Sequence, residues 1–167
     1  MIEGNNNYKP FLELPNLEVV QQDRLIGKGS FGRVDQQQLA LKSGDMNIPL
    51  KSKAIKSFNL TQGAMFFDHE VTVMKQLKEK GNKSVPFLYE TSTDGKVGNI
   101  TMERIQGISP LSVAPDPEGN VVLDVGLKLA EAIHQTYLDG AVDIDPKIDS
   151  YKIEVDSKWR PIKVRLV

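Results

Sequence analysis

Arg24-Leu-Ile-Gly-Lys-Gly-Ser-Phe-Gly-Arg-Val34 is the sequence motif from which the rest of the chain is interpreted. Its three glycines, Gly27, Gly29 and Gly32, have a G-x-G-x-x-G spacing. Glycine can adopt a positive φ and lets the backbone come close to a ligand, because it has no Cβ. Consecutive N–H groups in such a loop can bind phosphate oxygens. The spacing also occurs in ordinary surface turns, so its meaning depends on the neighbouring segments.

Two nucleotide-binding arrangements use this spacing. In a dinucleotide-binding fold the glycines follow a buried parallel strand and begin a helix. A strand buried on both faces should be almost continuously apolar, but in the lead-in Gln21-Gln-Asp-Arg-Leu-Ile26 only Leu25 and Ile26 are apolar. In the other arrangement the glycines form the turn of a β-hairpin, and a lysine follows on the third strand. The sequence favours the hairpin.

A lysine stands where the hairpin arrangement requires one. The segment Lys53-Ala-Ile-Lys-Ser-Phe58 is similar to the V-A-I-K motif of protein kinases with its first residue replaced. The similarity implies that Lys56 takes the phosphate-pairing position.

A helix is predicted over residues 63–80, because Phe67, Val71, Met74 and Leu77 recur at helical spacing. Glu70 lies inside the arc that these four residues define. A buried carboxylate is costly without a partner, so we expect Glu70 to pair with a cation; the alternative is a glutamate at the edge of a solvated face. In protein kinases the glutamate of this helix pairs with the third-strand lysine. The glycine motif, lysine and glutamate, in this order, resemble the small lobe of a protein kinase.

The resemblance implies an α+β fold of the protein kinase-like, two-lobed type. It has a five-stranded antiparallel small lobe with one helix, and a reduced or truncated helical second lobe. The expected divisions are a flexible tail over 1–16, the small lobe over 17–105 and a partial large lobe over 106–167. The small-lobe strands are expected at 17–26, 32–41, 51–58, 85–89 and 97–105, with a loop at 43–49.

Composition excludes several classes of function. A chain of 167 residues with 40% hydrophobic residues suits one packed domain, and its net charge of −1 gives no reason to expect nucleic acid. Without cysteine there are no disulfides, no thiol catalysis and no cysteine-based metal sites. No apolar run approaches the ~18 residues of a membrane span, and the amino terminus lacks a Sec-type signal pattern. We expect a soluble protein, either cytoplasmic or secreted into a host cell by a specialised system.

The predicted fifth strand ends in Thr101-Met-Glu-Arg-Ile-Gln-Gly107, which looks like a kinase hinge. The resemblance puts Met102 at the back of an adenine pocket and lets Glu103 and Ile105 offer backbone groups to the base. A strand that simply ends at a glycine is the alternative. The remaining nucleotide-binding positions implied by the resemblance are Ile26, Ser30, Val34 and Ala54.

The second half contains one strong helical pattern. Residues 120–138 predict an amphipathic helix with Val122, Val125, Leu129 and Ile133 on one face, ended by Gly140. A hairpin is expected after it, with strands at 153–155 and 162–167.

The kinase catalytic loop should follow this helix in a form like H-R-D-x-x-x-x-N. Counting from Gly140 puts Asp143 at the histidine, Asp145 at the catalytic aspartate and Lys147 two residues later. The metal-binding asparagine is missing, and the residues near its place are Asp149 and Ser150. Acidic turn residues without any catalytic role are the alternative for Asp145.

In kinases the second strand of this hairpin runs into a D-F-G motif, whose aspartate holds Mg²⁺. The chain ends at Val167, one residue before that aspartate is due. We expect further residues in the reading frame, because an apolar strand is a poor natural terminus. Phosphoryl transfer is conditional on such an aspartate.

The sequence therefore predicts an ATP- and Mg²⁺-dependent serine/threonine protein kinase. Its short connection before the second-lobe helix and its altered catalytic loop resemble those of compact bacterial effector kinases of type III secretion. One such family phosphorylates a host heat-shock chaperone, so a host protein is the expected substrate. Two alternatives remain: a pseudokinase that binds a partner without phosphoryl transfer, and a small-molecule phosphotransferase of the antibiotic-kinase type.

Overall fold

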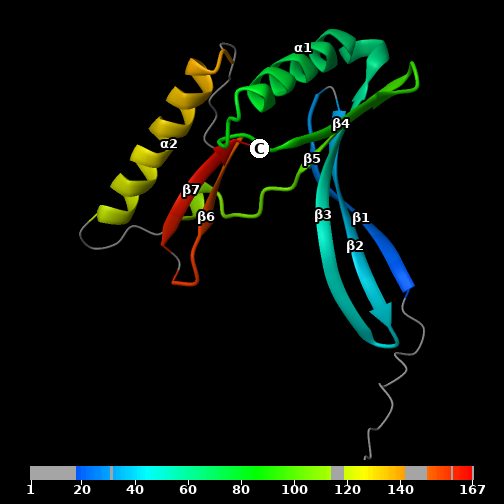
Figure 1. The fold of residues 1–167 in the computed structure, drawn as a ribbon, viewed down its shortest axis with the longest axis horizontal. Helices are drawn as coiled ribbons and strands as arrows, with labels where there is room; N and C mark the ends of the chain where they lie inside the picture. Colours follow the sequence, from blue (N-terminus) through cyan, green and yellow to red (C-terminus); the bar gives the residue numbers. More distant parts are fainter. Residues whose placement is uncertain (1–17, 31, 114–118, 142–149, 159, 167) are drawn as a thin grey trace, which may run out of the picture.

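The computed structural model describes residues 18–30, 32–113, 119–141, 150–158 and 160–166 (Figure 1). We call the first part of the structure, β1–β5 with α1, the sheet unit, and the rest the hairpin unit. The elements, in order, are β1 (Glu18–Lys28), β2 (Gly32–Ser43), β3 (Met46–Asn59), α1 (Leu60–Glu79), β4 (Leu88–Thr93), β5 (Val97–Glu103), the 3₁₀ turn η1 (Pro110–Ser112), α2 (Asn120–Leu138), β6 (Tyr151–Val155) and β7 (Pro161–Leu166).

The sheet unit is a five-stranded antiparallel sheet in the order β1-β2-β3-β5-β4. Helix α1 connects β3 to β4 and lies across one face of the sheet (Figure 1). The apolar residues on that face form one core under the helix. Its buried members are Ala54, Phe58, Phe67, Met74, Leu88, Ile100 and Met102.

Helix α1 begins three residues before the predicted start at Gly63. The side chain of Asn59 caps it by accepting a hydrogen bond of 3.0 Å from the Thr61 N–H. Gly63 has non-helical angles (φ −129°, ψ 17°) and produces a kink. The start predicted from the sequence therefore coincides with this kink. The face predicted to be buried is confirmed: Phe67, Met74 and Leu77 are buried, and Val71 is partly buried.

The predicted loop at 43–49 is wrong. The chain turns at Gly44, whose φ is 58°, and β3 already begins at Met46. Ser43 pairs with Met46 and Leu41 pairs with Ile48, so backbone pairing with β2 extends through residues whose polar composition suggested a loop.

The predicted fourth strand at 85–89 is displaced, since β4 starts at Leu88. Pro86 has no N–H to give to a strand ladder. Val85 instead packs with Leu77 and Ala141 in a small core.

The hairpin unit packs α2 against β6 and β7. The predicted bounds of α2 are confirmed, and the buried residues of the common core are Val125, Tyr151, Ile153 and Val164. Leu129 and Ile133 pack against this core as expected. Val122 does not: it is 51% exposed, because the core does not extend to the first turn of the helix.

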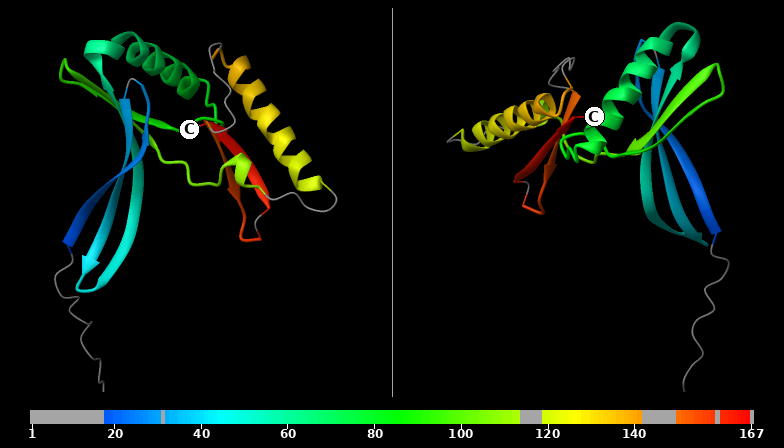
Figure 2. Two further views of the ribbon diagram at one scale, coloured as in Figure 1. Left: turned by 180° about the vertical axis from the view of Figure 1, so that it is seen from behind. Right: turned by 45° about the horizontal axis from the view of Figure 1, so that its top comes forward.

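The two units meet where the α1–β4 connection approaches the end of β7 (Figure 2). The Leu166 N–H donates to the Ser84 carbonyl at 2.8 Å. The Asn82 side chain donates to the Asp139 carboxylate at 2.7 Å. The chain passes from the sheet unit to the hairpin unit after Glu103. Ile108 then forms an antiparallel bridge with Ile153 of β6. Within the described ranges, no helix is long and apolar enough to cross a membrane.

Candidate functional site

Lys56 and Glu70 form the ion pair that the sequence predicted. The Lys56 Nζ lies 2.7 Å from Oε1 and 2.6 Å from Oε2 of Glu70. The ammonium is also 5.1 Å from the centroid of the Phe58 ring. Both charged side chains are about one-third exposed, at 34% and 30%. Ion pairs with this degree of exposure contribute little to stability. The carboxylate does fix the position of the Lys56 ammonium, which stays partly accessible on the helix side of the sheet.

Strand register explains why Lys56 faces the helix. Lys56 lies between Val34 on β2 and Ile100 on β5, and directly opposed residues share a face of the sheet. Ile100 is fully buried in the core under α1, so Val34 and Lys56 point the same way. Gly27 on β1 pairs with Val34 and completes the row.

A second row lies two residues along the same strands. Ala54 on β3 pairs with Met102 on β5, and both are buried in the core under α1. Residues two apart share a face of a strand, so Ala54 and Met102 lie beside Lys56. The structure thereby brings Val34, Ala54 and Met102, which the sequence assigned to nucleotide binding, to the face of the sheet that carries Lys56. Ile26, on the edge strand β1, is 45% exposed.

The glycine motif forms the β1–β2 hairpin and does not lead into a helix, as predicted. The Gly29 N–H closes the turn by donating to the Gly32 carbonyl at 2.8 Å, and Ser30 is exposed at its tip. Phe31 lies outside the described residues.

The glycines of this motif do not use the positive φ that glycine permits. None of Gly27, Gly29 and Gly32 is among the glycines with positive φ. Gly32 is required for a different reason: a Cβ there would collide with the carbonyl oxygen of Ser57 on β3. Its role in the fold is the close approach of two strands. A Cβ at Gly29 would find no atom nearer than 4.0 Å.

The predicted hinge residues follow the buried Met102. The Glu103 N–H donates to the Phe87 carbonyl at 2.8 Å. The Glu103 N–H is therefore engaged within the protein and is not free to contact a ligand. Ile105 lies beyond the end of β5 and is half-buried.

The Glu103 side chain has a role that the sequence did not reveal. Its carboxylate accepts two hydrogen bonds from the guanidinium of Arg165, at 2.8 and 2.6 Å. These bonds hold the pKa of Glu103 below its ordinary value. No local pattern marks this pair, because 62 residues separate its members.

The residues proposed for catalysis are largely outside the described part of the chain. Asp143, Asp145, Lys147 and Asp149 all fall in 142–149. Ser150 is described and directly precedes β6, where it is half-buried. The described residues contain no group of three or more histidine or acidic side chains able to hold a metal ion.

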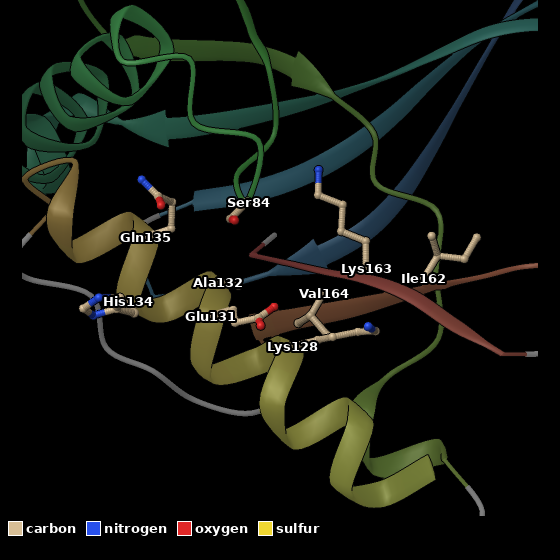
Figure 3. A pocket seen from close by; sticks show the side chains of 9 residues that line it. All are labelled: Ser84, Lys128, Glu131, Ala132, His134, Gln135, Ile162, Lys163 and Val164. Atoms are coloured by element: carbon tan, nitrogen blue, oxygen red, sulfur yellow. The ribbon is translucent and has the colours of Figure 1, made fainter. Parts of the chain in front are cut away.

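Two hollows of the surface lie away from the ion pair. One, of about 430 Å³, lies between α2 and β7 (Figure 3). Another of about 430 Å³ lies between α1 and β4. Neither is lined by Lys56 or Glu70. We place the candidate site at the ion pair, because the fixed charge, the glycine hairpin and the apolar strand positions converge there.

Comparison with known proteins supplies a structural relative only. No family model matches the chain, and no curated protein matches it. Among solved structures, the crystal structure of Rad53 1–466 in complex with AMP-PNP matches with a TM-score of 0.63 and 18% sequence identity. The match covers 89% of this chain and 38% of that one. Since Rad53 is a kinase, the likeness shows that this chain has a protein kinase-like fold.

Proposed function

We propose that this protein is an ATP-dependent protein kinase that transfers the γ-phosphoryl group to a serine or threonine hydroxyl of a protein. One observation carries the proposal: in a protein kinase-like fold, Lys56 is paired with Glu70 and lies in register with Val34 and Gly27 of the glycine hairpin. Positioning and electrostatic stabilisation do most of the work in phosphoryl transfer. A fixed ammonium with a carboxylate behind it provides both.

The binding residues then have distinct tasks. The hairpin with Gly27, Gly29, Ser30 and Gly32 covers the phosphates, and Lys56, oriented by Glu70, pairs with their oxygens. The apolar walls for the adenine are Ile26, Val34, Ala54 and Met102. The base would donate a hydrogen bond to the Glu103 carbonyl and accept one from the Ile105 N–H. The AMP-PNP in the Rad53 structure supports ATP as the nucleotide.

The catalytic residues remain proposals from the sequence. Asp145 would accept the proton of the substrate hydroxyl, and Lys147 would offset the charge of the transferred group. Mg²⁺, when bound, would neutralise phosphate oxygens; Asp149 and Ser150 are the residues of this chain proposed to hold it. The proposed lobes are 17–105 and 106–167, with a tail at 1–16.

We also infer that the protein is a bacterial effector that acts on a host protein, and a chaperone is the proposed substrate. The short connection between the hinge and α2 supports this proposal, because its described regular structure is a single 3₁₀ turn, Pro110–Ser112.

A pseudokinase is the second candidate. It is favoured by the departures in the catalytic loop, where Asp143 stands at the histidine position and the asparagine is missing. The pseudokinase keeps the ion pair and the glycine hairpin for nucleotide or partner binding and performs no transfer.

Phosphate transfer from radiolabelled ATP to a serine/threonine peptide library tests the proposal. Replacing Lys56 with Met should reduce transfer about 100-fold or more, because one fixed charge is lost from the site. Lys53→Met is the matched control: this lysine lies on the same strand and 5.5 Å from the Tyr89 ring centroid, away from Glu70. Equal transfer by the parent and Lys56→Met contradicts the proposal. Nucleotide binding by the parent without any transfer supports the pseudokinase.

A further inference from the structure

Arg165 is a buried cation at the junction of the two units. It lies on β7, is 8% exposed, and donates to acceptors in several directions. Its two terminal nitrogens donate to the Glu103 carboxylate at 2.8 and 2.6 Å. One of them also donates to the Val85 carbonyl at 2.7 Å, and the other to the Glu154 carboxylate at 3.3 Å.

These acceptors come from separate segments of the chain. Glu103 ends β5, Val85 lies in the α1–β4 connection, and Glu154 lies on β6. Arg165 and Glu154 belong to the hairpin unit, whereas Glu103 and Val85 belong to the other side of the junction. The guanidinium therefore joins Glu103, the last residue of β5, to β7 of the hairpin, and the two residues are 62 positions apart in the chain.

Glu103 is held on its other side as well. Its carboxylate accepts a bond of 3.1 Å from the Phe87 N–H, and its own N–H donates 2.8 Å to the Phe87 carbonyl. The backbone and the side chain of Glu103 are thus both engaged. A displacement of β7 relative to β5 would have to break either the bidentate contact between Arg165 and Glu103 or the hydrogen bonds between Glu103 and Phe87.

Other hydrogen bonds between the units hold α1 and the α1–β4 connection against the hairpin unit. Leu166 bonds to Ser84, Asn82 bonds to the Asp139 side chain, and Gln76 on α1 bonds to the Asp139 carbonyl. Arg165 also reaches the segment that begins at Glu103, where the chain passes from one unit to the other.

We propose that Arg165 is a positioning residue that fixes the end of β5 against β7 and thereby sets the backbone of residues 103–105 for the adenine base. The assignment of the base to this segment rests on the proposed function; the restraint between the units does not. An arginine suits the task because its planar fork can satisfy a carboxylate bidentately and still reach other acceptors, which a lysine cannot do.

The restraint can be measured directly, because the chain contains no cysteine. Leu50 on β3 and Leu123 on α2 are 49% and 64% exposed, so both accept a cysteine and a spin label. Double electron–electron resonance on the labelled pair then gives the distribution of distances between the units. Arg165→Met should broaden this distribution relative to the parent, and Arg165→Lys should give an intermediate width.

Arg160→Met is the matched control. Arg160 belongs to the same hairpin, and its ion pair with Asp156, at 2.6 Å, stays within the hairpin unit. This variant should keep the parental distribution. A parental width in folded Arg165→Met overturns the proposal. If Arg165→Met does not fold, Arg165→Lys decides by the same comparison.

Titration with a fluorescent ATP analogue tests the link to the base. Arg165→Met should raise the Kd about threefold to tenfold, with partial recovery in Arg165→Lys and no change in Arg160→Met. Equal affinity of the parent and Arg165→Met overturns the positioning role. If the parent binds no nucleotide, the proposed function fails, and the distance measurement still decides whether Arg165 restrains the units.

Discussion

The ammonium of Lys56 lies 2.6 Å from the carboxylate of Glu70, although the two residues are 14 positions apart on a strand and a helix. Both are about one-third exposed, so solvent screens their attraction. The pair is a poor source of stability for this fold. Under the proposed function, the geometry of the pair holds the Lys56 ammonium in a fixed place for the phosphates.

Glu70→Gln should therefore separate activity from stability. Losing the carboxylate frees the Lys56 side chain, and we expect kcat/KM for ATP to fall about 10- to 100-fold. The free energy of unfolding should change by about 1 kcal/mol or less, because the ion pair is exposed. Steady-state kinetics and urea unfolding measure the two effects. Glu79→Gln, an exposed position on the same helix, is the control and should leave both unchanged.

Gly32→Ala should destabilise the sheet by about 1–3 kcal/mol, because the new Cβ would collide with the Ser57 carbonyl oxygen. Gly29→Ala has no atom nearer than 4.0 Å to meet and no positive φ to lose, so it should stay within about 0.5 kcal/mol of the parent. Urea unfolding of both variants makes the comparison. Equal destabilisation by the two substitutions would contradict the packing role of Gly32.

Asn59→Ala should lower the free energy of unfolding by about 1 kcal/mol. The substitution removes the oxygen that accepts the Thr61 N–H at 3.0 Å and leaves the first turn of α1 without its side-chain cap. Asn59→Asp keeps an acceptor and should retain most of the stability. Urea unfolding distinguishes the two variants, and an aspartate variant as unstable as the alanine variant would rule out the cap.

The Glu103–Arg165 contact should make stability depend on pH in the acidic range. Hydrogen bonds from Arg165 lower the pKa of Glu103 below its ordinary value of 4.5. A carboxyl group whose pKa is lower in the folded state binds fewer protons there than in the unfolded state. Its contribution is fully present above pH 4.5 and is lost as the pH falls through the folded-state pKa.

Melting temperatures of the parent and Glu103→Gln between neutral pH and pH 3 test this linkage. The parent should melt higher at neutral pH, and the difference should shrink below about pH 4.5. A difference that stays constant over the whole range would show that the charge of Glu103 does not contribute.

Local patterns were sufficient where the structure is locally determined. The bounds of α2 follow from its apolar spacing and from Gly140, whose φ of 96° ends the helix. The buried face of α1 follows in the same way from Phe67, Met74 and Leu77. The glycine spacing correctly predicted a hairpin, because a partly polar lead-in cannot be a strand buried on both faces.

Composition was misleading where pairing decides. Met46, Ile48 and Leu50 alternate with period two, a strand signal, yet the polar residues around them suggested a loop. Met46 and Ile48 pair with Ser43 and Leu41 of β2 and so belong to a strand, even though both side chains are exposed. Val85 was expected in a strand, but Pro86 and the contact with Leu77 determine its place.

The sequence by itself determined the order of the elements and the glycine hairpin, because these depend on neighbours within a few residues. It also showed that Glu70 lies on the apolar face of its helix, where a carboxylate requires a cation such as Lys56 as its partner. Only the tertiary structure decided that Gly32 is required by Ser57 and that Arg165 binds Glu103. Both contacts join segments brought together by strand register and packing. No periodicity along the chain encodes which distant residue will lie opposite.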